Sequence, residues 1–223
     1  MVFLVAAVMA LPGAAHSAMW VGGELGGNFP GNTKINVDGQ NLSGSTNFDP
    51  SVIGGVTIGY DFVNSGFGAY AWPSWMQYFS FAMDLTYNRL NVKTGTNGLG
   101  AVLPLRSQLS GYEVAWTFLF MAHYGFFPDS EVPSGRVNPY IGVGPAILWS
   151  GIDAGSLGVG SASATNVALV VEPGIRWVLL SNVSVDTAFR YRYAVPSWDL
   201  DNDNVKANPL HQYTFLIRAN YHF

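Results

Sequence analysis

Bulky apolar residues alternate with small or polar residues along much of this chain. In residues 79–88, Phe79, Phe81 and Met83 are followed by Leu85 and Tyr87, each separated from the next by one smaller or polar residue. The same alternation occurs in 52–62, 111–120, 167–177, 183–192 and 212–223, and two glycine-rich segments, 19–29 and 138–149, complete eight. Because successive side chains of a β-strand point to opposite faces, the pattern predicts eight strands.

The two faces of these strands differ in a way that favours a membrane barrel. The bulky face is rich in aromatic residues and has no charge in mid-strand, whereas the opposite face combines Gly, Ala, Ser and Thr with isolated charges. A lysine or arginine facing lipid at mid-bilayer would cost about 2–4 kcal/mol, and small residues fit the narrow lumen of an eight-stranded barrel. The sequence therefore predicts an all-β fold, an eight-stranded antiparallel up-and-down transmembrane β-barrel. A soluble sandwich or lipocalin-like barrel is the alternative.

Two further observations set the domain organisation. Residues 2–11 are a short apolar run, followed by Pro, Gly and a series of small residues, which predicts a signal peptide at 1–18 with cleavage between 15 and 18. No Lys or Arg precedes this run, unlike the usual signal peptide, and a buried N-terminal helix or strand is the alternative. Residues 19–223 are expected to form the barrel domain, and no later run of 18 apolar residues predicts a transmembrane helix.

The connections between strands fall into two groups. The longer segments 30–50, 91–106, 150–164 and 194–210 hold all three lysines and are expected at the outer end of the barrel. At the inner end, Ser181-Asn182 predicts a tight turn, whereas 63–77 and 122–136 are long and rich in Pro and aromatic residues.

Three segments resemble the OmpA-like and opacity-protein-like superfamily of outer-membrane barrels. They are 138–144 (NPYIGVG), 186–193 (DTAFRYRY) and 211–223, which ends on Tyr221 and Phe223. The resemblance implies an eight-stranded barrel in the outer membrane of a Gram-negative bacterium, with terminal aromatic residues recognised by the barrel-assembly machinery. It also implies adhesion, membrane-integrity or small-pore roles, without pointing to one activity.

Charged residues on the small-residue face define the main candidate site. We expect the lumen to hold six acids and four arginines: Glu24, Asp61, Asp84, Glu113, Glu172, Asp186, Arg176, Arg190, Arg192 and Arg218. Buried charges persist only when paired and hydrogen-bonded, so these residues predict an ion-pair network that plugs the lumen. A narrow gated conduit, opened when acid–arginine partners exchange, is the alternative.

The distance between Glu172 and Arg176 on the predicted strand 167–177 limits which ion pairs these two residues can form. Glu172 and Arg176 both point inward but lie roughly 13 Å apart along the strand, too far to pair directly. Each is therefore expected to find partners on adjacent strands, with Asp186, Arg190 and Arg192 the nearest.

Two arginines occupy lipid-facing positions near the outer strand ends. Arg89 and Arg106 could bind lipopolysaccharide phosphates through their guanidinium groups, or they are solvated rim charges.

Composition excludes several other functions. The net charge of −4 gives no basic patch for nucleic acid, and the absence of cysteine excludes thiolate chemistry. The four histidines have no metal-ligand spacing and belong to no Ser/His/Asp set, so we expect no cofactor, no metal and no enzymatic activity, with a lipid-modifying enzyme as the third alternative. We predict a monomeric structural or surface-interaction protein whose partners are outer-membrane lipid and lipopolysaccharide, the assembly machinery, and a host or surface ligand bound by the outer loops.

Overall fold

A computed structural model of the chain describes residues 19–37, 40–46, 48–62, 72–91, 110–153, 161–195, 197–200, 203–207 and 209–223. The predicted signal peptide at 1–18 and its cleavage site lie outside these residues. Within the described ranges, no helix is long and apolar enough to cross a membrane.

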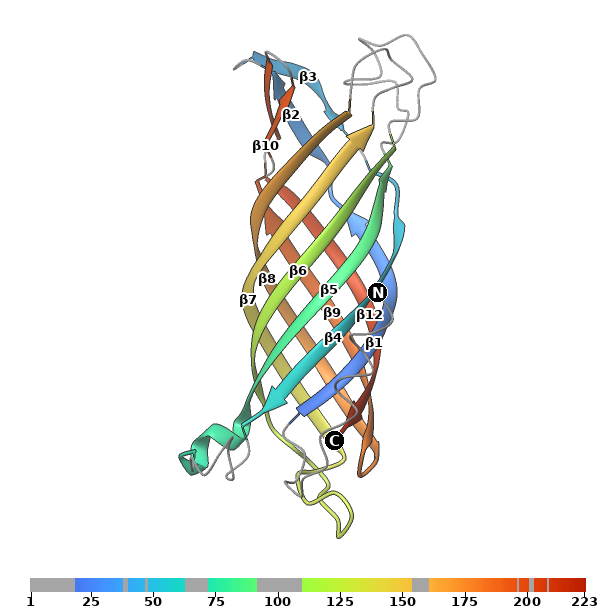
Figure 1. Cartoon of the computed structure of the whole chain (residues 1–223), viewed down its shortest axis with the longest axis vertical. Coiled ribbons are helices and arrows are strands. Elements are labelled where there is room, and N and C mark those ends of the chain that lie inside the picture. Colours follow the sequence, from blue (N-terminus) through green and yellow to red (C-terminus); the bar gives the residue numbers. More distant parts are fainter. Residues whose placement is uncertain are drawn as a thin grey trace.

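Eight antiparallel strands form one closed barrel (Figure 1), which confirms the predicted fold. Their bounds are β1 Met19–Pro30, β4 Ser51–Asp61, β5 Phe79–Asn91, β6 Ser110–His123, β7 Val137–Asp153, β8 Ser161–Leu180, β9 Val183–Ala194 and β12 Leu210–His222. Each strand pairs with its neighbour in this order, and β1 pairs with β12 from Trp20↔His222 to Pro30↔Gln212 to close the barrel. The barrel leaves no unpaired strand edge, as a bilayer requires.

The alternation in sequence becomes an alternation of burial. Along β12, inward-facing residues are buried and outward-facing residues are exposed in strict turn through most of the strand. Phe215 is 59% exposed and Ile217 is 62% exposed, whereas Leu216 between them is 2% exposed. The bulky face thus points outward and the small-residue face lines the lumen.

The outer end contains more strand than the sequence predicted. Two hairpins, β2 Thr33–Val37 with β3 Gln40–Thr46 and β10 Ser197–Leu200 with β11 Asp203–Ala207, join through β2 and β11 into a four-stranded sheet (Figure 1). Parts of the expected loops 30–50 and 194–210 are therefore strands, and β7 and β8 include residues 150–153 and 161–164 of the expected loop 150–164. The added strands and the longer ends of β7 and β8 are held by hydrogen bonds between backbones. Polar segments carry no apolar alternation in their side chains, so the sequence does not predict this pairing.

The inner end carries both chain ends of the barrel and three connections of different form. Ser181-Asn182 is the tight turn that the sequence predicted. Between β4 and β5, a short 3₁₀-helix, η2, spans Ser74–Tyr78. Between β6 and β7, residues 124–136 form an ordered loop, in which a bridge between Phe126 and Val137 extends the strand pairing.

Charged residues fix the tip of this second loop. The Asp129 carboxylate accepts hydrogen bonds from the backbone N–H groups of Glu131 (3.0 Å) and Val132 (2.7 Å). Arg136 donates to Asp129 (2.5 Å) and Glu131 (2.7 Å), and also to the carbonyl of Leu179 at 3.0 Å beside the β8–β9 turn. The long connection is thus tied to its neighbouring hairpin.

Candidate functional site

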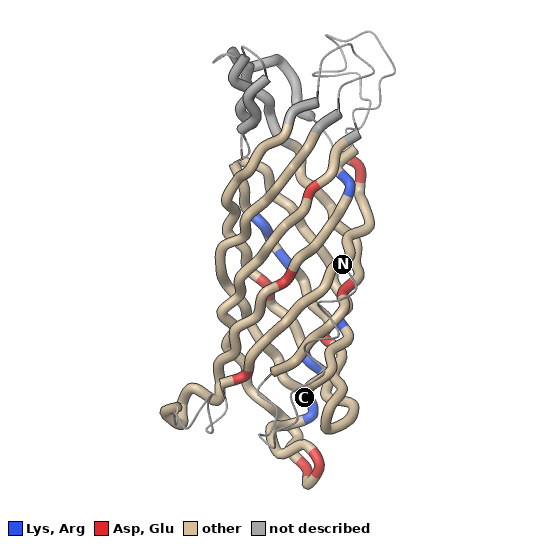
Figure 2. Tube along the Cα trace, viewed as in Figure 1, with Lys and Arg blue, Asp and Glu red and all other residues tan. Residues whose placement is uncertain are grey.

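The strand parity brings all ten predicted charged residues into the lumen. Nine of them are buried, and Asp61 at the inner end of β4 keeps a partly exposed side chain. Figure 2 shows that these charges are spread along the height of a wall that is otherwise mostly uncharged. The arrangement follows from the alternation alone, since every second residue of a strand faces inward.

Arg190 on β9 is the centre of the ion pairs. Its guanidinium group contacts Glu172 on the adjacent β8, with Nε at 2.6 Å, and Asp84 across the lumen on β5, with Nη2 at 2.7 Å. Glu24 on β1 lies 3.9 Å away. Arg190 has no exposed surface, so these carboxylates replace its hydration.

Two other arginines extend this cluster toward the inner end. Arg218 binds Glu24 (2.7 Å), Glu172 (3.3 Å) and Asp186 (3.4 Å). Arg176 binds Asp186 through Nε at 3.0 Å and lies 3.6 Å from Asp61.

These contacts define the central cluster, which consists of Glu24, Asp61, Asp84, Glu172, Asp186, Arg176, Arg190 and Arg218. Five carboxylates face three guanidinium groups, so full ionisation leaves two excess negative charges.

Arg192 belongs to a separate layer nearer the outer end. Its Nη1 donates to Glu113 (2.6 Å) and to Gln212 (3.1 Å), and Gln212 donates in turn to Glu113 (2.9 Å). This differs from the expected pairing of Arg192 with Glu172, because Glu113 lies on β6 across the lumen.

The Nε and Nη2 atoms of Arg192 are buried and have no hydrogen-bond partner in the described part of the chain. Arg176, Arg190 and Arg218 all use this pair of atoms to bind carboxylates. Arg192 is therefore the least satisfied arginine of the four.

Several lumen residues outside the predicted set support the ion pairs. Trp20 is completely buried, donates from Nε1 to Asp61 (3.2 Å) and lies under Arg176, whose Cζ is 4.4 Å from the ring centroid. Tyr140 donates to Glu172 (3.1 Å). Sequence reasoning missed these residues and Gln212, although Trp20 has the same parity as Glu24 on β1, and Gln212 has the same parity as Arg218 on β12. Tyr140 lies on β7, where no charged residue has its parity.

One serine–histidine pair also escaped the sequence analysis. The Oγ of Ser184 lies 2.9 Å from Nε2 of His222 at the inner end of the lumen. Ser184 is completely buried, and no carboxylate bonds this imidazole among the described residues. The pair thus lacks both the access and the third group that nucleophilic catalysis needs. The described residues also contain no cluster of three or more His, Cys, Asp or Glu side chains that could hold a metal ion.

The remaining predicted site residues lie at the two ends of the barrel. Arg89 is exposed on the outward face of β5, two residues from its outer end, and Arg106 lies outside the described residues. Tyr221 and Phe223 face outward at the inner end, with ring centroids 5.3 Å apart. The backbone N–H of Phe223 donates to the carbonyl of Met19 (3.1 Å) at the closing seam.

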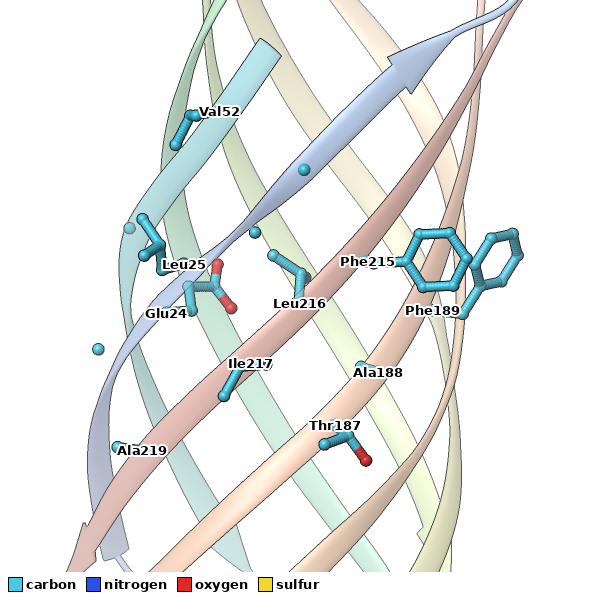
Figure 3. Close-up of a pocket in the computed structure, with 14 residues that line it drawn as sticks. Glu24, Leu25, Val52, Thr187, Ala188, Phe189, Phe215, Leu216, Ile217 and Ala219 are labelled. Carbon is cyan, nitrogen blue, oxygen red and sulfur yellow. The ribbon is translucent and has the colours of Figure 1, made fainter. Parts of the chain in front are cut away.

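A groove of about 1060 Å³ lies over the seam of β1 and β12 (Figure 3). Gly23 and Gly27 leave it open because they have no side chains, while Leu25, Phe215 and Phe189 line its outward side. Glu24 and Leu216 approach it from the lumen side. The outward lining is mostly apolar and faces the lipid, so the groove is a feature of the lipid-facing surface.

Several solved outer-membrane proteins have a fold similar to that of this chain. The crystal structure of the outer membrane protein OprG from Pseudomonas aeruginosa is similar over 94% of this chain and 98% of that chain, with 16% identity and a TM-score of 0.62. Neisserial surface protein A is similar over 95% and 100% of the two chains, with 14% identity and a TM-score of 0.51. The outer membrane protein AlkL is similar over 96% and 94%, with 15% identity and a TM-score of 0.53.

These likenesses concern the fold. No protein among the curated sequences matches the chain. The family model described as "Outer membrane protein beta-barrel domain" matches residues 1–223, the whole sequence. The chain therefore belongs to the outer membrane protein β-barrel family and is a protein of the Gram-negative outer membrane.

Proposed function

We propose that this barrel is a structural or surface-interaction protein, with a lumen closed by ion pairs and contacts made by its outer loops. The observation that carries the proposal is the filled centre of the lumen. Arg190, Glu172 and Asp84 meet there with no exposed surface beyond 2%. The lumen of an eight-stranded barrel is just wide enough for its own side chains. In this barrel, Asp84 and Arg190 bridge the lumen from β5 to β9.

The outer sheet supports the second half of the proposal. β2 and β3 come from the first outer connection and β10 and β11 from the last, and their pairing joins connections that are distant in sequence. Binding residues in proteins concentrate on segments held by a rigid scaffold. A ligand on a host cell or another surface is therefore expected to contact this end.

The proposed partners follow from the two ends of the barrel. Lipopolysaccharide would contact Arg89 at the outer rim, and the barrel-assembly machinery would recognise Tyr221 and Phe223. The proposal includes removal of residues 1–18 as a signal peptide and a monomer as the functional unit. It assigns no catalytic role to the lumen carboxylates.

Conductance in planar lipid bilayers tests the plug. The wild-type barrel should show little or no steady current, because the side chains of the central cluster are buried against one another across the lumen. A large and constant open state would refute the plug and favour a channel.

A narrow gated conduit is the second candidate, and one observation favours it. Glu172 contacts both Arg190 and Arg218, and Asp186 contacts both Arg176 and Arg218. Carboxylates shared in this way can change partners without losing all of their ion pairs. Brief openings that become more frequent in Arg218→Met would support the conduit, whereas a silent wild type and a silent variant would exclude it.

A further inference from the structure

Six exposed aromatic residues gather at the inner end of the barrel on one side. They come from η2, the start of β5 and the loop 124–136, and we call them the inner aromatic patch: Trp75, Tyr78, Phe79, Tyr124, Phe126 and Phe127. Their exposed fractions range from 39% for Phe79 to 74% for Phe127. Side chains of this size are normally buried, so a patch of this kind marks a contact surface.

Ring contacts join the two connections into one surface. Tyr78 from η2 stacks on Tyr124, with ring centroids 5.8 Å apart and an angle of 16° between the planes. Tyr124 also contacts Phe126 edge-on at 5.1 Å, and Trp75 contacts Phe79 edge-on at 5.7 Å. Trp75 and Tyr78 are three residues apart in a 3₁₀-helix and therefore share one of its faces.

The patch continues the lipid-facing surface of the barrel. Phe79 begins β5, and the next outward residue, Phe81, packs against Phe120 of β6 with ring centroids 5.1 Å apart. Figure 1 shows η2 standing out sideways from the inner end of the barrel, away from the barrel wall. Residues 72–79 contain no charged residue, whereas the tip of the loop 124–136 carries Asp129 and Glu131.

We propose that the inner aromatic patch lies in the headgroup region of the phospholipid leaflet at this end, with η2 docked along the membrane surface. Trp and Tyr favour this depth because their rings are apolar and their N–H and O–H groups can stay hydrated. An uncharged, aromatic segment beside the lipid-facing wall can place its rings at the membrane interface without burying a charge. The inference goes beyond the proposed function, since it concerns the opposite end of the barrel from the ligand-binding loops.

The absence of cysteine from the chain makes a direct test simple. A nitroxide spin label is attached to Trp75→Cys in one variant and to Ser130→Cys, at the charged tip of the other loop, in the matched control. Both barrels are folded into phosphatidylcholine vesicles, and collision rates with O₂ and with a water-soluble nickel chelate are measured by electron paramagnetic resonance. The label on η2 should collide several-fold less often with the nickel chelate, and more often with O₂, than the control label. Equal exposure of the two labels to the nickel chelate would overturn the proposal.

Two further measurements separate lipid from protein contact. Tyr78→Ser/Tyr124→Ser in the Trp75→Cys background removes the stacked pair and should raise nickel access to the label. If this variant fails to fold, the comparison of the first two labels still decides the question. Dilution of the barrel with more lipid should leave the shielding unchanged. A loss of shielding on dilution would show that a second copy of the chain covers the patch, and would overturn the proposal.

Discussion

Replacement of Arg190 by methionine tests whether the central cluster holds the barrel together. Among the described residues, Asp84 forms its ion pair and both of its hydrogen bonds with Arg190, whereas Glu172 also binds Arg218 and Tyr140. Arg190→Met therefore leaves Asp84 as a carboxylate that is 2% exposed and has no ion-pair partner among the described residues. It also raises the excess of negative charge in the central cluster from two to three.

The expected destabilisation is large. Removal of one partner from a buried ion pair typically costs about 3–5 kcal/mol, mainly because the remaining charge stays buried without compensation. Arg190→Met/Asp84→Asn restores the original charge difference and replaces the orphaned carboxylate with a neutral amide of similar shape. The double variant should therefore recover a substantial part of the loss. Entry of water into the lumen would reduce both the destabilisation by Arg190→Met and the recovery in the double variant.

Arg192→Met is the matched control for this experiment. It removes a buried arginine of the same strand and also breaks one buried ion pair, with Glu113. Glu113 keeps its hydrogen bond from Gln212 (2.9 Å), however, and the unpartnered Nε and Nη2 atoms disappear with the side chain. Arg192→Met should therefore destabilise less than Arg190→Met. Urea unfolding of the barrel in lipid vesicles, followed by tryptophan fluorescence and by gel mobility without boiling, gives the free energies. The reasoning fails if Arg190→Met is as stable as the wild type, or if the double variant is less stable than Arg190→Met.

Three further predictions concern other parts of the barrel. Phe223→Asp should sharply reduce the amount of folded barrel in cells, measured by gel mobility, and normal assembly would contradict a role in recognition. Gly22→Ala should destabilise, because the new Cβ would meet a side chain of β12 and a backbone carbonyl at 2.8 Å, whereas Gly23→Ala has open space and should be neutral in the same unfolding assay. The backbone N–H of Val132 and the side chain of Arg136 lower the pKa of Asp129. Ionised Asp129 stabilises the loop tip fully above its unfolded pKa of about 4, and this stabilisation disappears as pH falls through the folded pKa. A spin label at Ser130→Cys should therefore become more mobile on acidification. Unchanged mobility would contradict this.

The sequence predicts which residues face the lumen, but only part of their pairing. Every charged residue of the central cluster could be placed inward because a strand alternates with period two. The ion pairs Arg176–Asp186 and Arg190–Glu172 can also be predicted from the sequence, because they join the adjacent strands β8 and β9. The contacts of Arg190 with Asp84 and of Arg192 with Glu113 were not, because they cross the lumen. Their heights depend on the stagger of the closed barrel, which no single strand encodes.

The structure at the two ends of the barrel was also only partly predictable from the sequence. The alternation of apolar and polar residues weakens in polar segments, so β2, β3, β10 and β11 were expected to be loops. The loop 124–136 carries its own signal in Asp129 and Arg136, but its order also depends on the carbonyl of Leu179 in the next hairpin. Such a contact between separate connections becomes visible only when the barrel is closed.

The arginines in the two layers of the lumen differ in how many carboxylates they bind. Arg192 and Gln212 are cross-strand partners on β9 and β12, close to the outer ends of both strands. β9 ends at Ala194 and leads into β10 at Ser197, while β11 ends at Ala207 and leads into β12 at Leu210. A ligand that displaces the outer sheet therefore acts first on the layer around Arg192, where two buried donors already lack partners. The central cluster lies further inside and each of its arginines binds at least two carboxylates. If the outer loops bind a ligand as proposed, rearrangement in the lumen should thus begin at the outer layer and stop at Arg190.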